Sequence, residues 1–531
     1  MIYNEMQPID QQKLFSLKDK KFLHNIDSLY YVIKVANDWN HDPGCLRFRS
    51  LLKIYKEKAV KRFNEDPLVL FQGGNFNLGT QFVMNGIGSK PYLYDITKVD
   101  KYLMFVMDNQ LNENTPEIWV QLRSQNLWLF GEYQAFEESL KDIQRILAAF
   151  DIEIQEVKEN RIDFAYHTNY IQDPNNYFNN KNLNRMQKSR FERWGQDGAF
   201  RGQFETETDY ITLGRKTSNN LFFRICDNNK EVIEQGYKQF FIKLWYMENM
   251  ISYFDMYCIE KAFLQPSRTN YKYLDVARLL FYIEHGQNQE MILEAKNLIY
   301  QKSLDYEAII DLADRLVPKV TKILNVEIET KRKFYYSMDN SINALLKVHT
   351  KDAPDYAKLM YLKLDNKQVF HDYITCNNQE QQGVIRFLNM KAKNKNGVGW
   401  TDKAKYPTSQ FWARLQGLKI NKRIDQEDVK LLREYQKTLS AKLRKKKIDN
   451  MISTYNLYLH GENVQGDPYH DTLDYMATIN ESDTENQIKY KSKKFTLLQN
   501  RLGDVEGLPG KLDKKFKIYD TETGESIASY H

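Results

Sequence analysis

The amino-acid sequence predicts an α+β fold, in which an antiparallel sheet packs against helices and a largely helical, basic C-terminal region follows. Residues 209–234 have the pattern of a β-hairpin, with two strand-forming runs around a basic, polar turn. Residues 117–167 alternate strand patterns with one amphipathic helix. Residues 401–460 combine helical patterns with many cations. Strands, a helix and a hairpin in this order favour an α+β sheet.

The composition indicates a globular protein of several domains. The chain has 531 residues, of which 42% are hydrophobic and 13% aromatic, so it can form sizeable cores. Four cysteines lie far apart without a C-x-x-C motif, which favours a reducing compartment and argues against a zinc site. No apolar run approaches the ~18 residues of a membrane span, and no signal peptide opens the sequence. We therefore expect a soluble, cytoplasmic protein that makes no contact with a membrane.

The order of the patterns divides the chain into segments. We expect a helical N-terminal segment (1–68), an α+β domain (69–290), a helical region (291–400), a basic helical DNA-binding region (401–477), and a linker and tail (478–531). The N-terminal segment includes a basic amphipathic helix at 46–63. This helix could face DNA, although a solvated surface is the commoner role of such a charge pattern.

Within these segments we expect particular elements. Residues 117–131 predict two short strands around a polar turn, 132–150 an amphipathic helix, and 152–167 a strand. Residues 231–264 predict helix, and 287–350 are also expected to be helical. Residues 274–286 fit either a strand or a buried helix, because a short apolar run does not distinguish the two.

Two clusters of cations are candidates for phosphate binding. Arg215, Lys216 and Arg224 lie in or beside the hairpin, which is either a phosphate platform or a solvated hairpin. The surplus positive charge lies elsewhere, because residues 411–450 hold 12 Lys and Arg against five Asp and Glu, in a chain whose net charge is +6. Within this stretch, Arg444, Lys445, Lys446 and Lys447 suit DNA phosphate contacts, or form a solvated helix end.

Several familiar catalytic motifs are absent from the sequence. No two histidines are separated by a single residue, no Gly-rich loop ends in G-K-[ST], and there is no G-x-S-x-G. Asp163 remains as a carboxylate on a predicted buried strand, two residues after Arg161. A buried carboxylate must be paired or bound to metal. Asp163 is therefore either the ion-pair partner of an arginine or part of a Mg²⁺ or Mn²⁺ site.

Three ordered blocks resemble the replication initiation factor (Rep_trans) family, which includes rolling-circle plasmid initiators and related relaxases of conjugative elements. The family pattern has R-x-D-apolar-A, then Y-x-G-x-R-x-S, then R-I-Y-(D/N)-K-x-x-E. The matching residues here are Arg161, Asp163 and Ala165; Gly214, Arg215 and Ser218; and Arg224, Ile225 and Glu231. The resemblance covers residues 100–290 and implies the family's antiparallel sheet.

The resemblance also implies a chemistry. A tyrosine in R-I-Y attacks a DNA phosphodiester while a carboxylate-held Mg²⁺ or Mn²⁺ polarises the phosphate. Carried over to this chain, the nucleophile position is Cys226 beside Arg224, and the metal ligands are Asp163, Glu231 and His167. The hairpin residues that would bind DNA are Arg215, Lys216 and Ser218.

The sequence departs from the family at three places. Cys226 replaces the tyrosine, and His167 stands where many members carry a second Asp. If 277–286 match the family's late strand, then Arg278 is present but Leu280 takes the place of a Glu. Nicking is therefore left open, with Tyr210 and Tyr237 as other candidate nucleophiles. DNA binding should survive such changes better, because it depends on many distributed cations.

These observations lead to a functional hypothesis. The chain is expected to be an origin-binding replication initiator of a plasmid or mobile element, with double- and single-stranded origin DNA as its partner. A host helicase or polymerase and a second copy of the chain are further candidate partners. The alternative is a catalytically inactive DNA-binding regulator or structural protein of a mobile element. A bound Mg²⁺ or Mn²⁺ is expected only if nicking persists.

Overall fold

The protein is described here by a computed structural model. It describes Phe15 and residues 20–61, 69–70, 82–85, 91–98, 101–110, 112–177, 187–189, 200–201, 210–213, 220–235, 238–264, 272–300, 304–338, 340–377, 383–402, 405–420, 517–519 and 526–529. The chain divides into two compact units. The first comprises Met1–Leu29, Leu127–Glu132 and Glu159–Tyr435, and the second comprises Tyr30–Asn126, Tyr133–Lys158 and Gln436–His531. Each unit is built from several separate stretches of the sequence.

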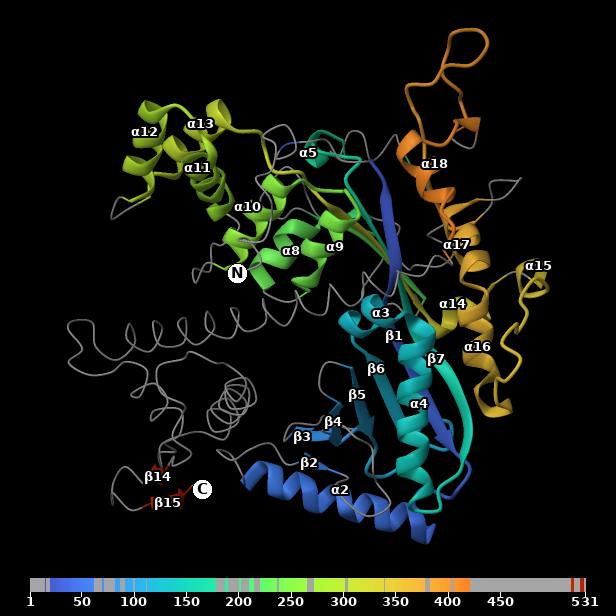
Figure 1. Ribbon diagram of the computed structural model, residues 1–531. Coiled ribbons are helices and arrows are strands. Elements are labelled where there is room, and N and C mark those ends of the chain that lie inside the picture. Colours follow the sequence, from blue (N-terminus) through green and yellow to red (C-terminus); the bar gives the residue numbers. More distant parts are fainter. Residues whose placement is uncertain are drawn as a thin grey trace. The chain divides into compact units, whose positions relative to one another are not determined.

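The second unit contains an antiparallel sheet with two helices (Figure 1). Its strands follow the order β2 (Val69–Leu70), β3 (Phe82–Asn85), β4 (Tyr94–Lys98), β5 (Tyr102–Val106) and β6 (Ile118–Leu122). The helices are α2 (Pro43–Lys61) and α4 (Glu132–Ala148). Residues along β4, β5 and β6 alternate between buried and half-buried, so one face of each strand turns to the core.

Two long strands contribute residues to both units. They are β1 (Phe22–Val35) and β7 (Ile154–Thr168). In the first unit the order continues from β1 and β7 to β12 (Leu324–Lys331), β11 (Leu221–Asp227), β10 (Tyr210–Leu213) and β9 (Phe200–Arg201). The pairs from β7 to β9 are antiparallel. The predicted hairpin is therefore β10 and β11, with Tyr210 opposite Cys226.

Helices of the first unit contact both faces of this sheet. On one face lie α3 (Ser124–Phe130), α8 (Asn228–Gln235) and α9 (Phe240–Met247), where Trp128, Phe241 and Trp245 surround His167 of β7. On the other face, α14 (Arg332–Tyr336), α17 (Lys367–Thr375) and α18 (Gln410–Gln416) supply aromatic contacts, including Trp412 against Phe223. The strands between these layers are consequently buried on both sides, and β12 is buried from Leu324 to Thr330.

The remaining elements complete the first unit. The helices α10 (Tyr253–Phe263), α11 (Tyr273–His285), α12 (Gln289–Ile299) and α13 (Tyr306–Leu316) pack on one another. Shorter elements are α5 (Pro174–Tyr177), α15 (Asn340–Asn343), a 3₁₀ turn (Asp355–Ala357), α16 (Lys358–Asp365), and the pair β8 (Gln187–Ser189) with β13 (Ile385–Phe387). A small hairpin of β14 (Lys517–Tyr519) and β15 (Ser526–Ser529) belongs instead to the second unit.

The predicted fold class is confirmed: the protein is α+β, with a large antiparallel sheet and packed helices. Residues 274–286, which fitted either a strand or a buried helix, form helix α11. Three local predictions differ from the structure. The N-terminal segment contains the long strand β1, and 117–131 is one strand followed by the helix α3. The third difference matters most, because 287–350 was expected to be helical but contains the central strand β12.

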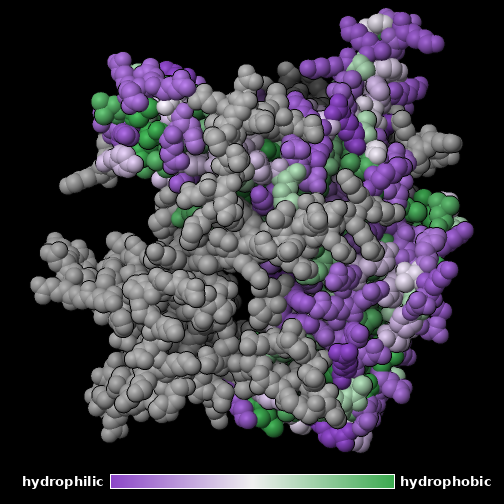
Figure 2. Space-filling model, in the orientation of Figure 1, coloured by the Kyte–Doolittle hydropathy of each residue, from purple (hydrophilic) through white to green (hydrophobic). Residues whose placement is uncertain are grey.

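The described surface is mostly hydrophilic, with a few apolar gatherings (Figure 2). One of them lies over the turn after α15, where Leu345 is 58% and Val348 40% exposed. Another lies on α12, where Leu293 is 60% exposed. None of the helices in the described ranges has both the length and the apolar character needed to span a membrane.

Candidate functional site

The site is built by strand register on one face of the first unit's sheet. Side chains alternate between faces along a strand, so Asp163 shares its face with Arg161, Ala165 and His167 of β7. The antiparallel pairing sets Asp163 opposite Glu329 and Ala165 opposite Glu327. On the other side of β12, Glu327 lies opposite Arg224 of β11. Three neighbouring strands therefore direct charged side chains to the same face.

Three carboxylates gather at the centre of this face. Asp163, Glu327 and Glu329 are all buried, and each offers an oxygen within 4.8 Å of the others. The small side chain of Ala165, opposite Glu327, adds little bulk beside them. Carboxylate oxygens are the hard ligands that Mg²⁺ and Mn²⁺ prefer, so this donor set suits such an ion.

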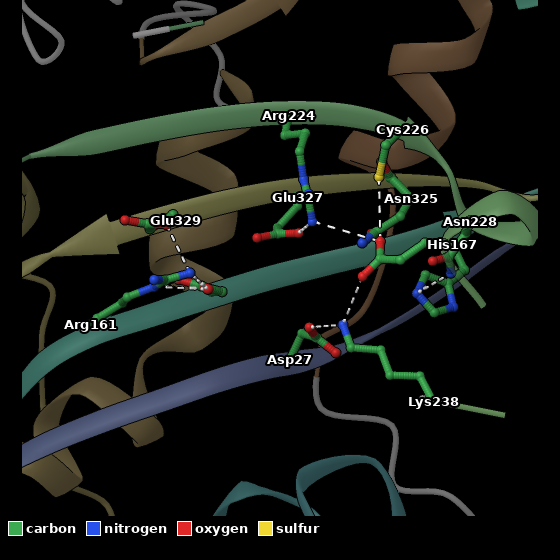
Figure 3. A network of polar contacts seen from close by, with 12 residues as sticks. Asp27, Arg161, His167, Arg224, Cys226, Asn228, Lys238, Asn325, Glu327 and Glu329 are labelled. Atoms are coloured by element: carbon green, nitrogen blue, oxygen red, sulfur yellow. Dashed lines mark hydrogen bonds and ion pairs between the residues drawn. The ribbon is translucent and has the colours of Figure 1, made fainter. Parts of the chain in front are cut away.

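Two arginines already pair with these carboxylates (Figure 3). Arg161 Nε lies 2.8 and 2.9 Å from the two Asp163 oxygens, and Arg161 Nη2 lies 2.8 Å from Glu329 Oε2. Arg224 Nη2 lies 2.5 Å from Glu327 Oε2. Lys331 adds an ion pair of 3.0 Å to Glu329. Each buried carboxylate therefore has a cationic partner, as the cost of burying charge requires.

Burial changes the acidity of Asp163. Desolvation raises the pKa of this carboxyl to about 7, and the neighbouring Arg161 guanidinium opposes that rise. Glu327 and Glu329 add to it, because like charges nearby disfavour ionisation. Asp163 can thus exchange a proton near neutral pH while it lies beside a fixed cation.

A second ionic cluster continues from Arg224 toward α8 (Figure 3). Asp227 Oδ1 accepts from the backbone N–H of Lys230 at 3.1 Å, which fixes the first turn of α8 and the position of Glu231. Glu231 lies 3.7 Å from Arg224 and 3.5 Å from Lys238, whose ammonium lies 2.7 Å from Asp27. Together with the carboxylate group, these ion pairs place five acids and four cations on one sheet face.

Cys226 lies beside Glu231 of the second cluster and is buried. Cys226 is 8% exposed, and its thiol donates a hydrogen bond to Glu231 Oε2 at 3.7 Å. Desolvation raises the pKa of the thiol far above its usual value, and Glu231 adds to the rise although Arg224 opposes it. The thiolate is the nucleophilic form of cysteine. Cys226 is therefore an enclosed thiol whose neutral form is favoured by its surroundings.

His167 is enclosed by aromatic side chains. Its ring stacks on Trp128 at a centroid distance of 4.8 Å, and Trp245 Nε1 donates to His167 Nδ1 at 3.1 Å. The other ring nitrogen faces the Asn228 amide at 3.0 Å. Burial lowers the pKa of this imidazole to about 3. Both nitrogens thus have protein partners, and His167 acts as a neutral packing residue.

The three residues expected to bind one metal ion lie in three different surroundings. Asp163 lies with Glu327 and Glu329, while Glu231 lies with Arg224 and Lys238, and His167 packs among tryptophans. The suggested match of 277–286 to the family's late strand is wrong, because these residues form α11 and Arg278 pairs with Asp275 and Asp314. The strand beside β7 is instead β12.

The other expected site residues lie outside the described part of the chain. They are Lys216, Arg215, Ser218, Tyr237, Arg444, Lys445, Lys446 and Lys447. Sequence reasoning missed Glu327 and Glu329. A signal for them exists in V-E-I-E-T, residues 326–330, where two acids alternate with β-branched residues in a strand-like pattern.

Comparison with known proteins gives little further information. No protein-family model and no curated protein matches the sequence. Among solved structures, the chain is similar to the rolling circle replication initiator protein from Geobacillus stearothermophilus, with a TM-score of 0.32 and 12% sequence identity. The similarity covers 76% of this chain and 100% of that one. A likeness at this level decides neither fold nor function, which therefore rest on the residues described above.

Proposed function

We propose that this chain is an origin-binding replication initiator of a plasmid or mobile element, in which Cys226 does not act as the nucleophile. One observation carries the proposal. Two of the sequence blocks that resemble the initiator family, far apart in the chain, meet at one charged face. Arg161, Asp163 and Ala165 lie on β7, while Arg224 and Glu231 lie on β11 and α8, with β12 between the two strands.

The carboxylate group supports a metal site at this face. Asp163, Glu327 and Glu329 would hold a Mg²⁺ or Mn²⁺ ion, which would polarise a DNA phosphate when bound. Arg224 lies next to this group and is 30% exposed, so its guanidinium can contribute to phosphate binding. The chain's own residues therefore offer positive and negative groups side by side, as a site for DNA phosphate and metal requires.

The state of Cys226 favours recognition over cleavage by this residue. The thiol is buried, neutral and next to the Glu231 carboxylate, so it offers no thiolate to a phosphodiester. This observation also favours the second candidate function, a catalytically inactive DNA-binding regulator of a mobile element. The two candidates differ in whether any nicking occurs at the origin.

A supercoiled-plasmid assay separates the two candidates. The plasmid would carry the DNA that flanks the chain's own gene, and the reaction would contain Mn²⁺. We expect specific binding of this DNA in a mobility-shift assay by the native protein and by Cys226→Ala alike. Nicking that survives Cys226→Ala would identify an initiator with a different nucleophile. Binding without nicking would favour the regulator.

Two results would contradict the proposal. Nicking that Cys226→Ala abolishes would make the thiol a nucleophile. Failure to bind the flanking DNA in preference to an unrelated fragment of equal length, at matched salt concentration, would exclude an origin-binding role. Salt must be matched because non-specific binding to phosphates falls steeply with ionic strength.

A further inference from the structure

Arg161 makes an unusual set of contacts for a residue beside a candidate metal site. Its guanidinium contacts both oxygens of Asp163, with Nε at 2.8 and 2.9 Å from them, and its Nη2 lies 2.8 Å from Glu329 Oε2. These are two of the three carboxylates that could hold a cation. Arg161 therefore occupies both oxygens of Asp163 and one oxygen of Glu329 within the group that could hold a cation.

From this geometry we propose that Arg161 is a built-in counter-ion that competes with a divalent cation for Asp163 and Glu329. Metal would enter the group of carboxylates only when the guanidinium leaves. The metal part of this inference rests on the proposed function, whereas the pairing of Arg161 does not.

The competition follows from charge and from coordination. A Mg²⁺ ion needs oxygen ligands at about 2.0–2.1 Å, and Mn²⁺ prefers the same kind of ligand. A carboxylate oxygen that points its lone pairs at a guanidinium cannot also provide that close contact in the same direction. A fixed positive charge at this distance also opposes a second cation, all the more because the surroundings are buried.

The position of Arg161 allows it to leave. Its side chain is 19% exposed, whereas those of Asp163 and Glu329 are each 1% exposed. The Arg161 side chain is therefore more accessible to solvent than the two carboxylates that it contacts. Once displaced it would be free to pair with a phosphate, for which its planar fork of donors is well suited. A DNA phosphate that attracts Arg161 would thus open the carboxylates to metal, and by reciprocity metal would strengthen DNA binding.

Arg224 provides a matched control. It is also an arginine on this face, but it contacts Glu327 and Glu231 and leaves the Asp163–Glu329 pair covered by Arg161. Substitution of Arg224 removes the same charge from the same face. The inference therefore predicts a larger effect on metal affinity for Arg161→Gln than for Arg224→Gln.

The test is Mn²⁺ binding to the full chain without DNA, measured by titration calorimetry and by the electron paramagnetic resonance signal of free Mn²⁺. We expect Arg161→Gln to bind Mn²⁺ at least about tenfold more tightly than the native protein, which is the scale on which a nearby unit charge acts on a charged group. Arg224→Gln should change the affinity less. Adding Glu329→Gln to Arg161→Gln should abolish the gain.

A thermal melt guards against a variant that folds poorly. Arg161→Gln leaves two buried carboxylates without their guanidinium, so its melting temperature should fall, and Mn²⁺ should restore it more than it raises that of the native protein. Arg161→Lys keeps the charge and should stay close to the native protein in Mn²⁺ affinity. Equal Mn²⁺ affinity in native protein and Arg161→Gln, or a gain that persists with Glu329→Gln, would overturn the inference.

The outcome is separable from that of the proposed function. DNA binding is measured on its own, in the presence of a chelator. If native protein binds the flanking DNA but Arg161→Gln gains no Mn²⁺ affinity, the inference fails and the proposed function stands. If Arg161→Gln gains Mn²⁺ affinity but no specific DNA binding is seen, the proposed function fails while the competition for the carboxylates holds.

Discussion

The two units use antiparallel strands in different ways. In the second unit, β4, β5 and β6 alternate buried and half-buried residues, as strands do when one face meets the core. In the first unit, β12 is buried from Leu324 to Thr330, and the last seven residues of β7 are buried as well. Helices contact both faces there, so neither set of side chains can turn to water.

The difference matters because the first unit places charges on its enclosed strands. Asp163, Glu327 and Glu329 lie on β7 and β12 and must be paired inside the protein. The second unit has a smaller counterpart, in which Lys98 of β4 pairs with Asp142 of α4. Buried ion pairs rarely add stability compared with apolar packing. A large cluster of them on doubly covered strands therefore points to a function, whereas the smaller cluster of Lys98 with Asp142 and Glu138 fits an ordinary structural role.

The largest expected effect comes from removing one cation from each unit. Arg161→Met removes the guanidinium that pairs with Asp163, whereas Glu329 keeps Lys331, and should cost about 3–5 kcal/mol of unfolding free energy, the usual penalty when one partner of a buried pair is removed. Lys98→Met should cost less, because the Tyr102 hydroxyl still donates to Asp142 at 3.1 Å. Urea unfolding followed by tryptophan fluorescence at neutral pH measures both. A larger loss for Lys98→Met would reverse the comparison between the units.

Acid should change the stability of the first unit through two residues whose effects oppose each other. The pKa of His167 is lowered from 6.5 to about 3, so between these values only the unfolded chain takes up a proton, and stability falls as the pH falls. The pKa of Asp163 is raised from 3.8 to about 7, so here the folded chain holds the extra proton and stability falls as the pH rises. For each residue, the unfolding free energy changes by at most about 1.4 kcal/mol per pH unit.

Single substitutions separate the two slopes. Between pH 6.5 and 5, His167→Gln should lose less stability on acidification than the native protein, and Asp163→Asn should lose more. Urea midpoints at the two pH values, in the presence of a chelator, give the comparison. Identical pH dependence in all three proteins would mean that neither residue changes its protonation on unfolding in this range.

Strand β7, helix α4 and the hairpin β10–β11 could be predicted from the sequence, whereas strand β12 was missed. The helix α4 and the hairpin β10–β11 follow local patterns, so their residues indicate their structure. Strand β12 reads L-N-V-E-I-E-T-K, and its acids suggest a solvated face. Their burial depends on partners that are distant in the sequence, because Glu327 pairs with Arg224, 103 residues away, and Glu329 pairs with Arg161. No local pattern reveals these pairs.

The residues of the candidate site were also predicted only in part from the sequence. Asp163 could be singled out because a carboxylate in an apolar strand needs a partner, and its partner Arg161 is two residues away. Glu231 and His167 were placed with Asp163 through the family resemblance, but Glu231 lies on α8 beside Arg224 and Lys238, and His167 lies further along β7 among tryptophans. A short apolar run such as L-W-L-F, residues 127–130, fits a strand or a helix, so the helix that carries Trp128 against His167 was also missed.

A smaller effect is expected from removing one buried cysteine from each unit. Cys226→Ala and Cys45→Ala should each cost about 1 kcal/mol, the value of one small buried group. Glu231 keeps Lys238 and Arg224 as partners when the thiol is lost, so no buried charge is left alone. Unfolding in urea under reducing conditions measures both. A loss of about 3 kcal/mol or more in Cys226→Ala alone would show that Glu231 depends on the thiol.

The smallest effect should come from an exposed ion pair, which sets the baseline for the buried ones. In the second unit, Arg47 Nη2 lies 2.9 Å from Asp151 Oδ2, and the two side chains are 60% and 84% exposed. Water screens such a pair and its side chains lose freedom in forming it, so Arg47→Met should change stability by less than about 0.5 kcal/mol. Arg47→Met and Arg161→Met each remove one guanidinium group from an ion pair of similar length. The two pairs differ mainly in how deeply they are buried. Equal losses in the two variants, measured by the same urea titration, would mean that enclosure of the first unit's strands does not decide the cost of an unpaired carboxylate.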